Sequence, residues 1–250
     1  DQLVAGLKAI PGIHKVTLTT NGILLARQLP ALLNAGLDSV NISLDTLRPE
    51  VFQRITARDG FSHVMEGLRA ALDSGIPVKL NCVPQAGVNE GELEDLAALA
   101  AAHPLQVRFI EMMPIGYGKE FRFRGEDEIC SILESAYGKM TPVIEHYGNG
   151  PCHYFAVPGF QGRIGFISAV SHKFCSECNR IRLTSEGFLK TCLQYDNGVE
   201  LKTILRGGGT DEDLRRAIGQ ALAEKPKGHS FEKKTEFTDR EHRGMSQIGG

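Results

Sequence analysis

The first half of the chain alternates short apolar runs rich in β-branched residues with longer segments of helical spacing. The apolar runs are residues 15–20, 39–44, 78–84 and 106–113, and the helical patterns occupy 23–36, 63–75 and 92–102. Strands that alternate with helices predict parallel βαβ units, and runs that are apolar on both faces predict a sheet covered by helices. The sequence therefore predicts an α/β protein, with either an open parallel sheet or part of a parallel (β/α) barrel. Within the first helix, Pro30 predicts a break and Gly36 a C-cap.

The pattern changes after residue 118. Residues 126–137 have helical spacing, and residues 141–146, 153–157, 163–168 and 181–184 are short strands between Gly- and Pro-containing turns, in an antiparallel style. An amphipathic helix is expected over 211–225, with Thr210 as its N-cap. We therefore predict a first domain over 1–118, a smaller α+β domain over 119–224 and an extended tail over 225–250.

Composition excludes several classes of protein. The net charge is −2, which argues against a general nucleic-acid surface. No apolar run is long enough to cross a membrane. The six cysteines come without a secretion signal, which disfavours a disulfide framework. These features favour a cytoplasmic protein that binds neither nucleic acid nor membranes. The chain starts within a helical pattern and without Met, so we expect an N-terminal part to be missing.

Two basic side chains stand out because they lie inside predicted strands. Lys79 lies in the run VKLNCV and Arg108 opens RFIEMM. A buried charge is costly unless it is paired. One interpretation is a structural ion pair with Glu111 or Asp45, and the other is a basic pocket for a phosphate or carboxylate ligand. The residues alone do not decide between them.

A cysteine cluster provides the clearest chemical signal. The segment FCSECNRIRLTSEGFLKTC places Cys175 and Cys178 in one tight turn and Cys192 after a predicted hairpin. A structural zinc site needs four ligands, and His172, His153 or Cys152 could supply the fourth. Alternatively, three cysteines could hold an iron–sulfur cluster with one open iron. Arg180 and Arg182 follow Cys178 and lie two residues apart, so both point to the same face of the predicted strand. They could be counter-charges for the cluster or donors to an anionic or purine ligand.

Several segments together resemble the GTP 3′,8-cyclase family of radical S-adenosylmethionine enzymes, which act in molybdenum cofactor biosynthesis. These segments are TTNG, SVNISLD, RFIEMMPIG, FISAVSHKFCSECNRIRLTSEGFLKTCL and the final MSQIGG. The resemblance implies a partial (β/α)6 barrel followed by a C-terminal cluster domain. It also implies a lyase that converts GTP to 3′,8-cyclo-7,8-dihydro-GTP, using S-adenosylmethionine and two 4Fe-4S clusters.

The resemblance also implies roles for individual residues. Cys175, Cys178 and Cys192 would hold the C-terminal 4Fe-4S cluster. Ser43 and Met113 would contact S-adenosylmethionine. Gly249 and Gly250 would form the tail that enters the active site, with a catalytic role. The expected GTP contacts are Thr19, Lys79, Arg108, Arg180, Ile181 and Arg182. The implied partners are a downstream cyclic pyranopterin monophosphate synthase and a second copy of the chain in a homodimer.

The sequence departs from the family at its N-terminus. Family members carry a CxxxCxxC motif for the radical-generating cluster, and this sequence has none. We therefore expect a fragment that cannot cleave S-adenosylmethionine alone, with the second cluster on the missing part. Two alternatives stay open: another radical S-adenosylmethionine enzyme with an auxiliary cluster, and a non-catalytic zinc-binding module. A pyridine-nucleotide enzyme is disfavoured because no Gly-rich dinucleotide fingerprint follows a strand.

Overall fold

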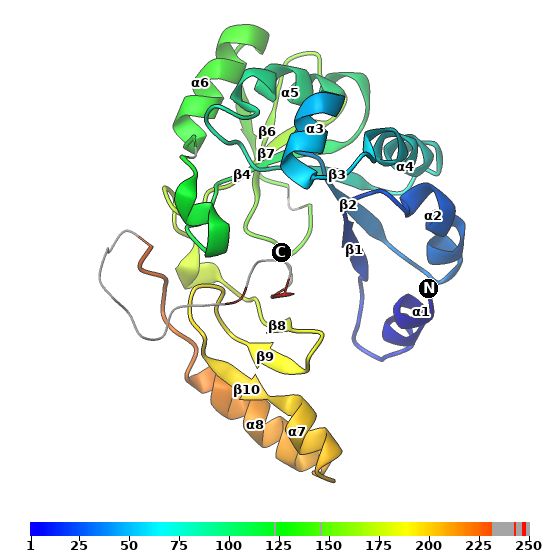
Figure 1. Cartoon of the computed structure of the whole chain (residues 1–250), viewed down its shortest axis with the longest axis vertical. Coiled ribbons are helices and arrows are strands. Elements are labelled where there is room, and N and C mark those ends of the chain that lie inside the picture. The colour runs from blue at the N-terminus through cyan, green and yellow to red at the C-terminus, as the bar shows by residue number, and fades with distance from the viewer. Residues whose placement is uncertain (123, 146, 232–242, 244–246, 249–250) are drawn as a thin grey trace. The chain divides into compact units, whose positions relative to one another are not determined.

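The computed structural model describes residues 1–122, 124–145, 147–231, 243 and 247–248 (Figure 1). The chain divides into two compact units. Unit 1 comprises Asp1–Glu111 and Arg122–Ser168, and unit 2 comprises Met112–Phe121 and Ala169–Gly250. This division differs from the expected boundary at residue 118, because the strands between residues 141 and 168 join the first sheet.

Unit 1 contains a seven-stranded sheet with the order β1-β2-β3-β4-β7-β6-β5. Neighbours from β1 to β4 pair in parallel, β7 continues the parallel part beside β4, and β6 and β5 add an antiparallel edge. The strands are β1 (Thr17–Thr20), β2 (Ser39–Ser43), β3 (Val78–Cys82), β4 (Gln106–Ile110), β5 (Thr141–Val143), β6 (His153–Ala156) and β7 (Arg163–Ile167).

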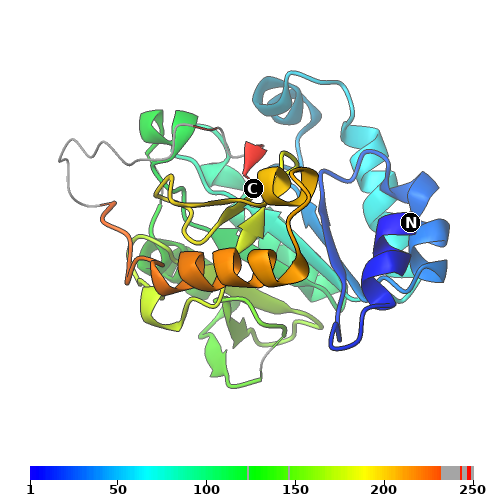
Figure 2. The ribbon, with the colours of Figure 1, turned by 90° about the horizontal axis from the view of Figure 1, so that it is seen from below.

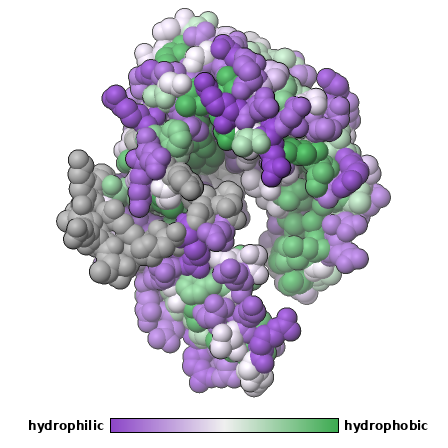
Figure 3. Space-filling view, viewed as in Figure 1, coloured by the Kyte–Doolittle hydropathy of each residue, from purple (hydrophilic) through white to green (hydrophobic). Residues whose placement is uncertain are grey.

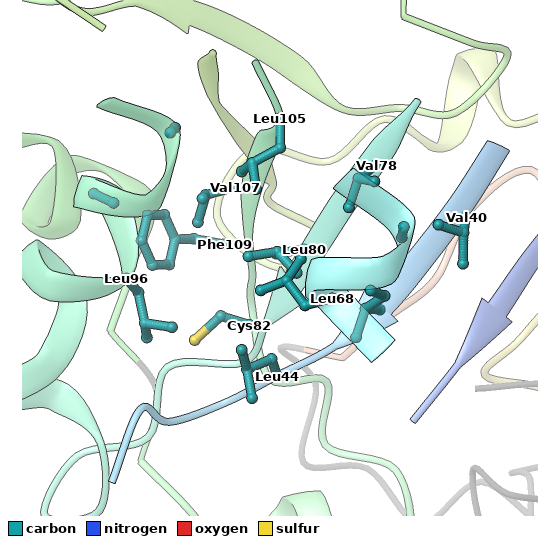
Figure 4. Close-up of a cluster of buried hydrophobic side chains, with 14 of the residues drawn as sticks. Val40, Leu44, Leu68, Val78, Leu80, Cys82, Leu96, Leu105, Val107 and Phe109 are labelled. Carbon is teal, nitrogen blue, oxygen red and sulfur yellow. The ribbon is translucent and has the colours of Figure 1, made fainter. Parts of the chain in front are cut away.

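Helices cover one face of this sheet. They are α1 (Gln2–Lys8), α2 (Leu25–Asn34), α3 (Pro49–Thr56), α4 (Phe61–Asp73), the short η1 (Glu90–Glu92), α5 (Leu93–Ala102) and α6 (Glu126–Tyr137). The core lies between the helices and alternate strand residues such as Leu80 and Phe109, which Figure 4 shows packed with Leu68 and Leu96 from α4 and α5. Since strand side chains alternate between faces, the other residues of the same strands point to the opposite face.

Unit 2 is built around a three-stranded antiparallel sheet. Its elements are η2 (Gly116–Glu120), η3 (Cys175–Glu177), β8 (Arg182–Leu183), β9 (Phe188–Lys190), β10 (Gly198–Glu200), α7 (Leu201–Arg206) and α8 (Asp211–Ala223). The sheet order is β10-β9-β8, and Figure 2 shows α8 running alongside it. Thr210 caps α8 in a reciprocal capping box with Asp213, which confirms its predicted role.

Most predicted elements are confirmed, and several details are wrong. Pro30 lies inside α2 without ending it, because the buried leucines of that helix pack on unit 1 and offset the cost of about 3 kcal/mol for an internal proline. The helix ends one residue earlier than predicted, with Ala35 as its C-cap, and Gly36 follows in the left-handed conformation with φ +91°. The short helices α3 and α7 and the short strand β10 were not predicted. Residues 163–167 were expected in an antiparallel second domain; β7 does pair antiparallel with β6, but it also pairs in parallel with β4 and so belongs to the first sheet.

Exposed apolar side chains gather near the N-terminus of unit 1. Leu3 on α1 and Ile10 just after it are 75% and 49% exposed. The space-filling view shows a hydrophobic area in this region (Figure 3). Among the described residues, none of the helices is both long enough and apolar enough to cross a bilayer.

Candidate functional site

A row of side chains crosses the sheet of unit 1 on the face opposite the helices. The strand register places Asn81 between Ser43 and Arg108, and Gly165 beside Arg108. A second row, two residues earlier on each strand, joins Thr19, Asn41, Lys79, Gln106 and Arg163. We call the face that carries these two rows the polar face. The structure thus brings four predicted site residues, Thr19, Ser43, Lys79 and Arg108, onto one surface of one sheet.

Lys79 is half-buried on the polar face. Its ammonium donates a hydrogen bond of 2.5 Å to the backbone carbonyl of Tyr147, in the loop between β5 and β6. Burial lowers the pKa of Lys79 below its usual value, and the positive charge of Arg108 lowers it further. Both effects disfavour the charged form. A bound anion would oppose them.

Arg108 is oriented by its neighbours on the polar face. Its Nε donates to Oδ1 of Asn81 at 2.8 Å, across the β3–β4 pairing. A planar guanidinium held in this way presents its remaining donors in a fixed direction, which suits a carboxylate or phosphate.

The ion-pair interpretation of these two cations is not supported. Among the described residues, the hydrogen-bond partners of Lys79 and Arg108 are uncharged. Asp45, one proposed counter-ion, instead accepts a 2.8 Å bond from the backbone N–H of Val83, and burial raises its pKa. The arrangement favours the alternative, a basic site for an anionic ligand.

The sequence reasoning missed a third cation on this face. Arg163 lies in the Lys79 row, and its Nη1 donates to the carbonyl of Gly162 at 2.8 Å. Its Nε is buried and has no hydrogen-bond partner among the described residues. The signal was available, because Arg163 opens the apolar run RIGFIS as Arg108 opens RFIEMM. It was overlooked because that strand was expected in the second domain.

Unit 2 carries the three cysteines of the predicted cluster motif. Cys175 begins η3 and Cys178 follows it, and the N–H of Cys178 donates to the carbonyl of Cys175 at 3.2 Å. Cys192 follows β9, whose antiparallel pairing with β8 confirms the predicted hairpin. All three thiols are free and partly exposed.

Two cations lie beside these cysteines. Burial lowers the pKa of Arg182, which begins β8, and the interaction of its charge with Cys178 and Cys192 opposes that shift. The ammonium of Lys225 is 3.8 Å from Sγ of Cys178 and donates to the carbonyl of the same residue at 2.6 Å.

No three His, Cys, Asp or Glu side chains in the described part of the chain converge as ligands of a single metal ion. In an iron–sulfur cluster, different cysteines bind different irons and so stand further apart than ligands of one ion. The donor set of Cys175, Cys178 and Cys192, with cations beside it, fits such a cluster.

Other predicted residues of unit 2 have defined positions. Arg180 stacks over the ring of Phe174 at 5.6 Å, and Ile181 is exposed. Met113 is half-buried in the segment that precedes η2. Gly249 and Gly250, predicted as the functional tail, lie outside the described residues.

Comparison with known proteins decides the family. The chain is 41% identical over 248 residues to "GTP 3′,8-cyclase" of Clostridium perfringens (strain 13 / Type A), covering 99% of this chain and 76% of that protein. The chain belongs to the GTP 3′,8-cyclase family. The protein of the same name from Syntrophomonas wolfei is 42% identical over 253 residues, covering 100% of this chain and 77% of the relative.

Further matches agree with this family. Human "Molybdenum cofactor biosynthesis protein 1" is 43% identical over 232 residues, covering 91% of this chain and 36% of that protein. The family model Radical SAM superfamily matches residues 1–100, and Molybdenum Cofactor Synthesis C matches 105–231. Membership of the radical S-adenosylmethionine superfamily implies a 4Fe-4S cluster and S-adenosylmethionine as cofactors.

The lowered pKa of Lys79 predicts a pH dependence of anion binding. Only the protonated amine attracts an anion, so the affinity for inorganic tripolyphosphate should be highest below the pKa of Lys79 and fall as the pH rises through it. Calorimetric titrations between about pH 7 and about pH 10 measure this decline. Lys79→Arg, which stays charged over that range, should flatten it. Equal pH slopes in the two proteins would contradict a role for Lys79.

Proposed function

We propose that this cyclase-family chain binds GTP through the polar face of unit 1. The proposed reaction converts GTP to 3′,8-cyclo-7,8-dihydro-GTP, the first step of molybdenum cofactor biosynthesis. The observation that carries the proposal is the placement of Lys79 and Arg108 on one face, both with uncharged hydrogen-bond partners. Two adjacent cations repel each other, and a polyphosphate relieves that repulsion while accepting their hydrogen bonds.

Three residues of the polar face have distinct tasks in this proposal. Arg108 binds phosphate oxygens through the N–H groups that its bond to Asn81 leaves available, and Lys79 supplies a compact positive charge beside it. Thr19 contacts the nucleotide from β1, where its hydroxyl already accepts a 3.1 Å hydrogen bond from Asn41. Anchoring the triphosphate in this way orients the ribose and the base.

The cysteines of unit 2 hold a 4Fe-4S cluster in this proposal. Cys175, Cys178 and Cys192 are its three ligands, and Arg182 and Lys225 offset part of its negative charge. When bound, the cofactors supply an open iron for guanine and a radical that abstracts the 3′ hydrogen of GTP. The sequence holds no CxxxCxxC motif, so these residues would not hold a radical-generating cluster.

The remaining assignments rest on the family. Arg180, Ile181 and Arg182 contact GTP, Ser43 and Met113 contact S-adenosylmethionine, and Gly249 and Gly250 act in catalysis. The sheet of unit 1 belongs to a partial (β/α)6 barrel, with the cluster domain after it. The protein works in the cytoplasm as a homodimer, and a cyclic pyranopterin monophosphate synthase consumes its product.

Removing one guanidinium tests the nucleotide site. Arg108→Gln should weaken GTP binding by about tenfold to about a hundredfold, because hydrogen bonds to charged groups contribute about 1.5–3 kcal/mol. Isothermal titration calorimetry measures the affinity. The control is Arg69→Gln, which removes an exposed arginine from α4 and should leave the GTP affinity unchanged. Equal GTP affinities for wild type and Arg108→Gln would refute the assignment.

Anaerobic reconstitution with iron and sulfide tests the cluster. Wild-type protein should acquire iron–sulfur absorption in the visible spectrum, and Cys192→Ala should lose most of it because one of three ligands is gone. Cys130→Ala, which removes a partly buried thiol from α6, should keep the spectrum. Colourless protein with stoichiometric zinc would instead favour a zinc-binding module.

A further inference from the structure

Gly165 makes a gap in the middle of the polar face. It pairs with Arg108 on β4 and with Tyr154 on β6, so only the strand β7 lies between these two residues. A Cβ at position 165 would lie 2.6 Å from Sγ of Cys152 and 2.8 Å from the ring of Tyr154. Both distances are shorter than a carbon atom tolerates. Only glycine allows the thiol and the phenol ring to occupy the space above β7.

The side chain of Tyr154 extends across this gap towards Arg108. Its side chain is buried, with 4% of the residue exposed, and its hydroxyl lies close enough to Arg108 and to Cys152 to interact with both. The ring is also fixed from the side by an edge-to-face contact with Tyr147, at 5.0 Å between centroids. Tyr147 is the residue whose carbonyl accepts the bond from Lys79. Lys79 and Arg108 are therefore connected through two packed tyrosines.

Donor chemistry allows one consistent direction for these contacts. A guanidinium can only donate, so towards Arg108 the Tyr154 oxygen is the acceptor, which leaves its O–H to face the sulfur of Cys152. The Cys152 thiol in turn donates to the carbonyl of His153 at 3.6 Å. Burial raises the pKa of Cys152 to about 11, so this thiol is neutral at physiological pH. Asn81 holds Arg108 from the other side.

We propose that Tyr154, admitted by Gly165 and aligned by Cys152, is a positioning residue that orients Arg108 for the phosphates of the nucleotide. The proposal rests on the proposed function of the polar face. Packing alone does not require the hydroxyl, because phenylalanine would fill the same space. The hydroxyl adds a fixed acceptor opposite Asn81, and a guanidinium held from both sides loses less rotational freedom when a ligand binds. Tyr154 acts on the ligand only through Arg108.

A double-mutant cycle tests this role. Calorimetry with GTP, and separately with inorganic tripolyphosphate, measures the affinities of wild type, Tyr154→Phe, Arg108→Lys and the double variant. Tyr154→Phe should weaken binding about tenfold in the wild-type background. In the Arg108→Lys background it should change the affinity by less than about twofold, because no guanidinium is left to orient. Tripolyphosphate should follow the same pattern, since the proposed effect concerns phosphates.

The matched control removes a different tyrosine hydroxyl from unit 1. Tyr137 donates a 2.9 Å hydrogen bond to the carbonyl of Glu94 in the helical layer, and Tyr137→Phe should leave both affinities unchanged. A second pair of variants keeps the proposal testable if Tyr154→Phe folds poorly. Cys152→Ala removes the acceptor for the tyrosine and should weaken GTP binding by a few-fold, and Cys152→Ser, which supplies an acceptor again, should recover most of that loss.

The outcomes separate this inference from the function on which it rests. If wild type binds neither GTP nor tripolyphosphate, the proposed function fails and this inference fails with it. If wild type binds and Tyr154→Phe binds equally well, only the inference is wrong. Equal losses from Tyr154→Phe in both backgrounds would likewise overturn it, because they would indicate a general structural effect. A loss of affinity from Tyr154→Phe that occurs with Arg108 present and disappears in the Arg108→Lys background supports the positioning role.

Discussion

The alternation of side chains along β3 and β4 determines where the chemistry of unit 1 can take place. Val78, Leu80 and Cys82 point into the core beneath the helices, so Lys79 and Asn81 must point to the other face. The same geometry turns Arg108 away from Val107 and Phe109. A shift of register by one residue would bury two cations and expose the core, which makes the register strongly specified. The apolar core and the polar face are thus two results of one constraint.

Cations on the polar face are held by neutral groups. A carboxylate partner would neutralise Lys79 or Arg108 and leave little attraction for a ligand, whereas a carbonyl, a carboxamide and a phenol orient the cations and preserve their charge. Unit 2 is arranged differently at its cysteines, because there two cations, Arg182 and Lys225, lie beside the sulfurs.

The sequence predicts the parallel sheet well because each strand and its helix are neighbours along the chain. Lys79 and Arg108 could be selected because a charge within an apolar strand is conspicuous. Pro30 was misjudged because local propensity ignores the packing of the α2 leucines. Tyr154 could not be found at all. Its approach to Arg108 depends on β7 pairing with β4, a contact between segments more than fifty residues apart, and on the missing side chain of Gly165.

The most direct test of the central claim is a crystal structure of this chain with GTP bound. The account predicts triphosphate oxygens within hydrogen-bond distance of Nζ of Lys79 and of the Arg108 guanidinium, with the bond from Arg108 to Asn81 retained. Density for the nucleotide away from the polar face, with both cations keeping only the partners they have in the free protein, would contradict it.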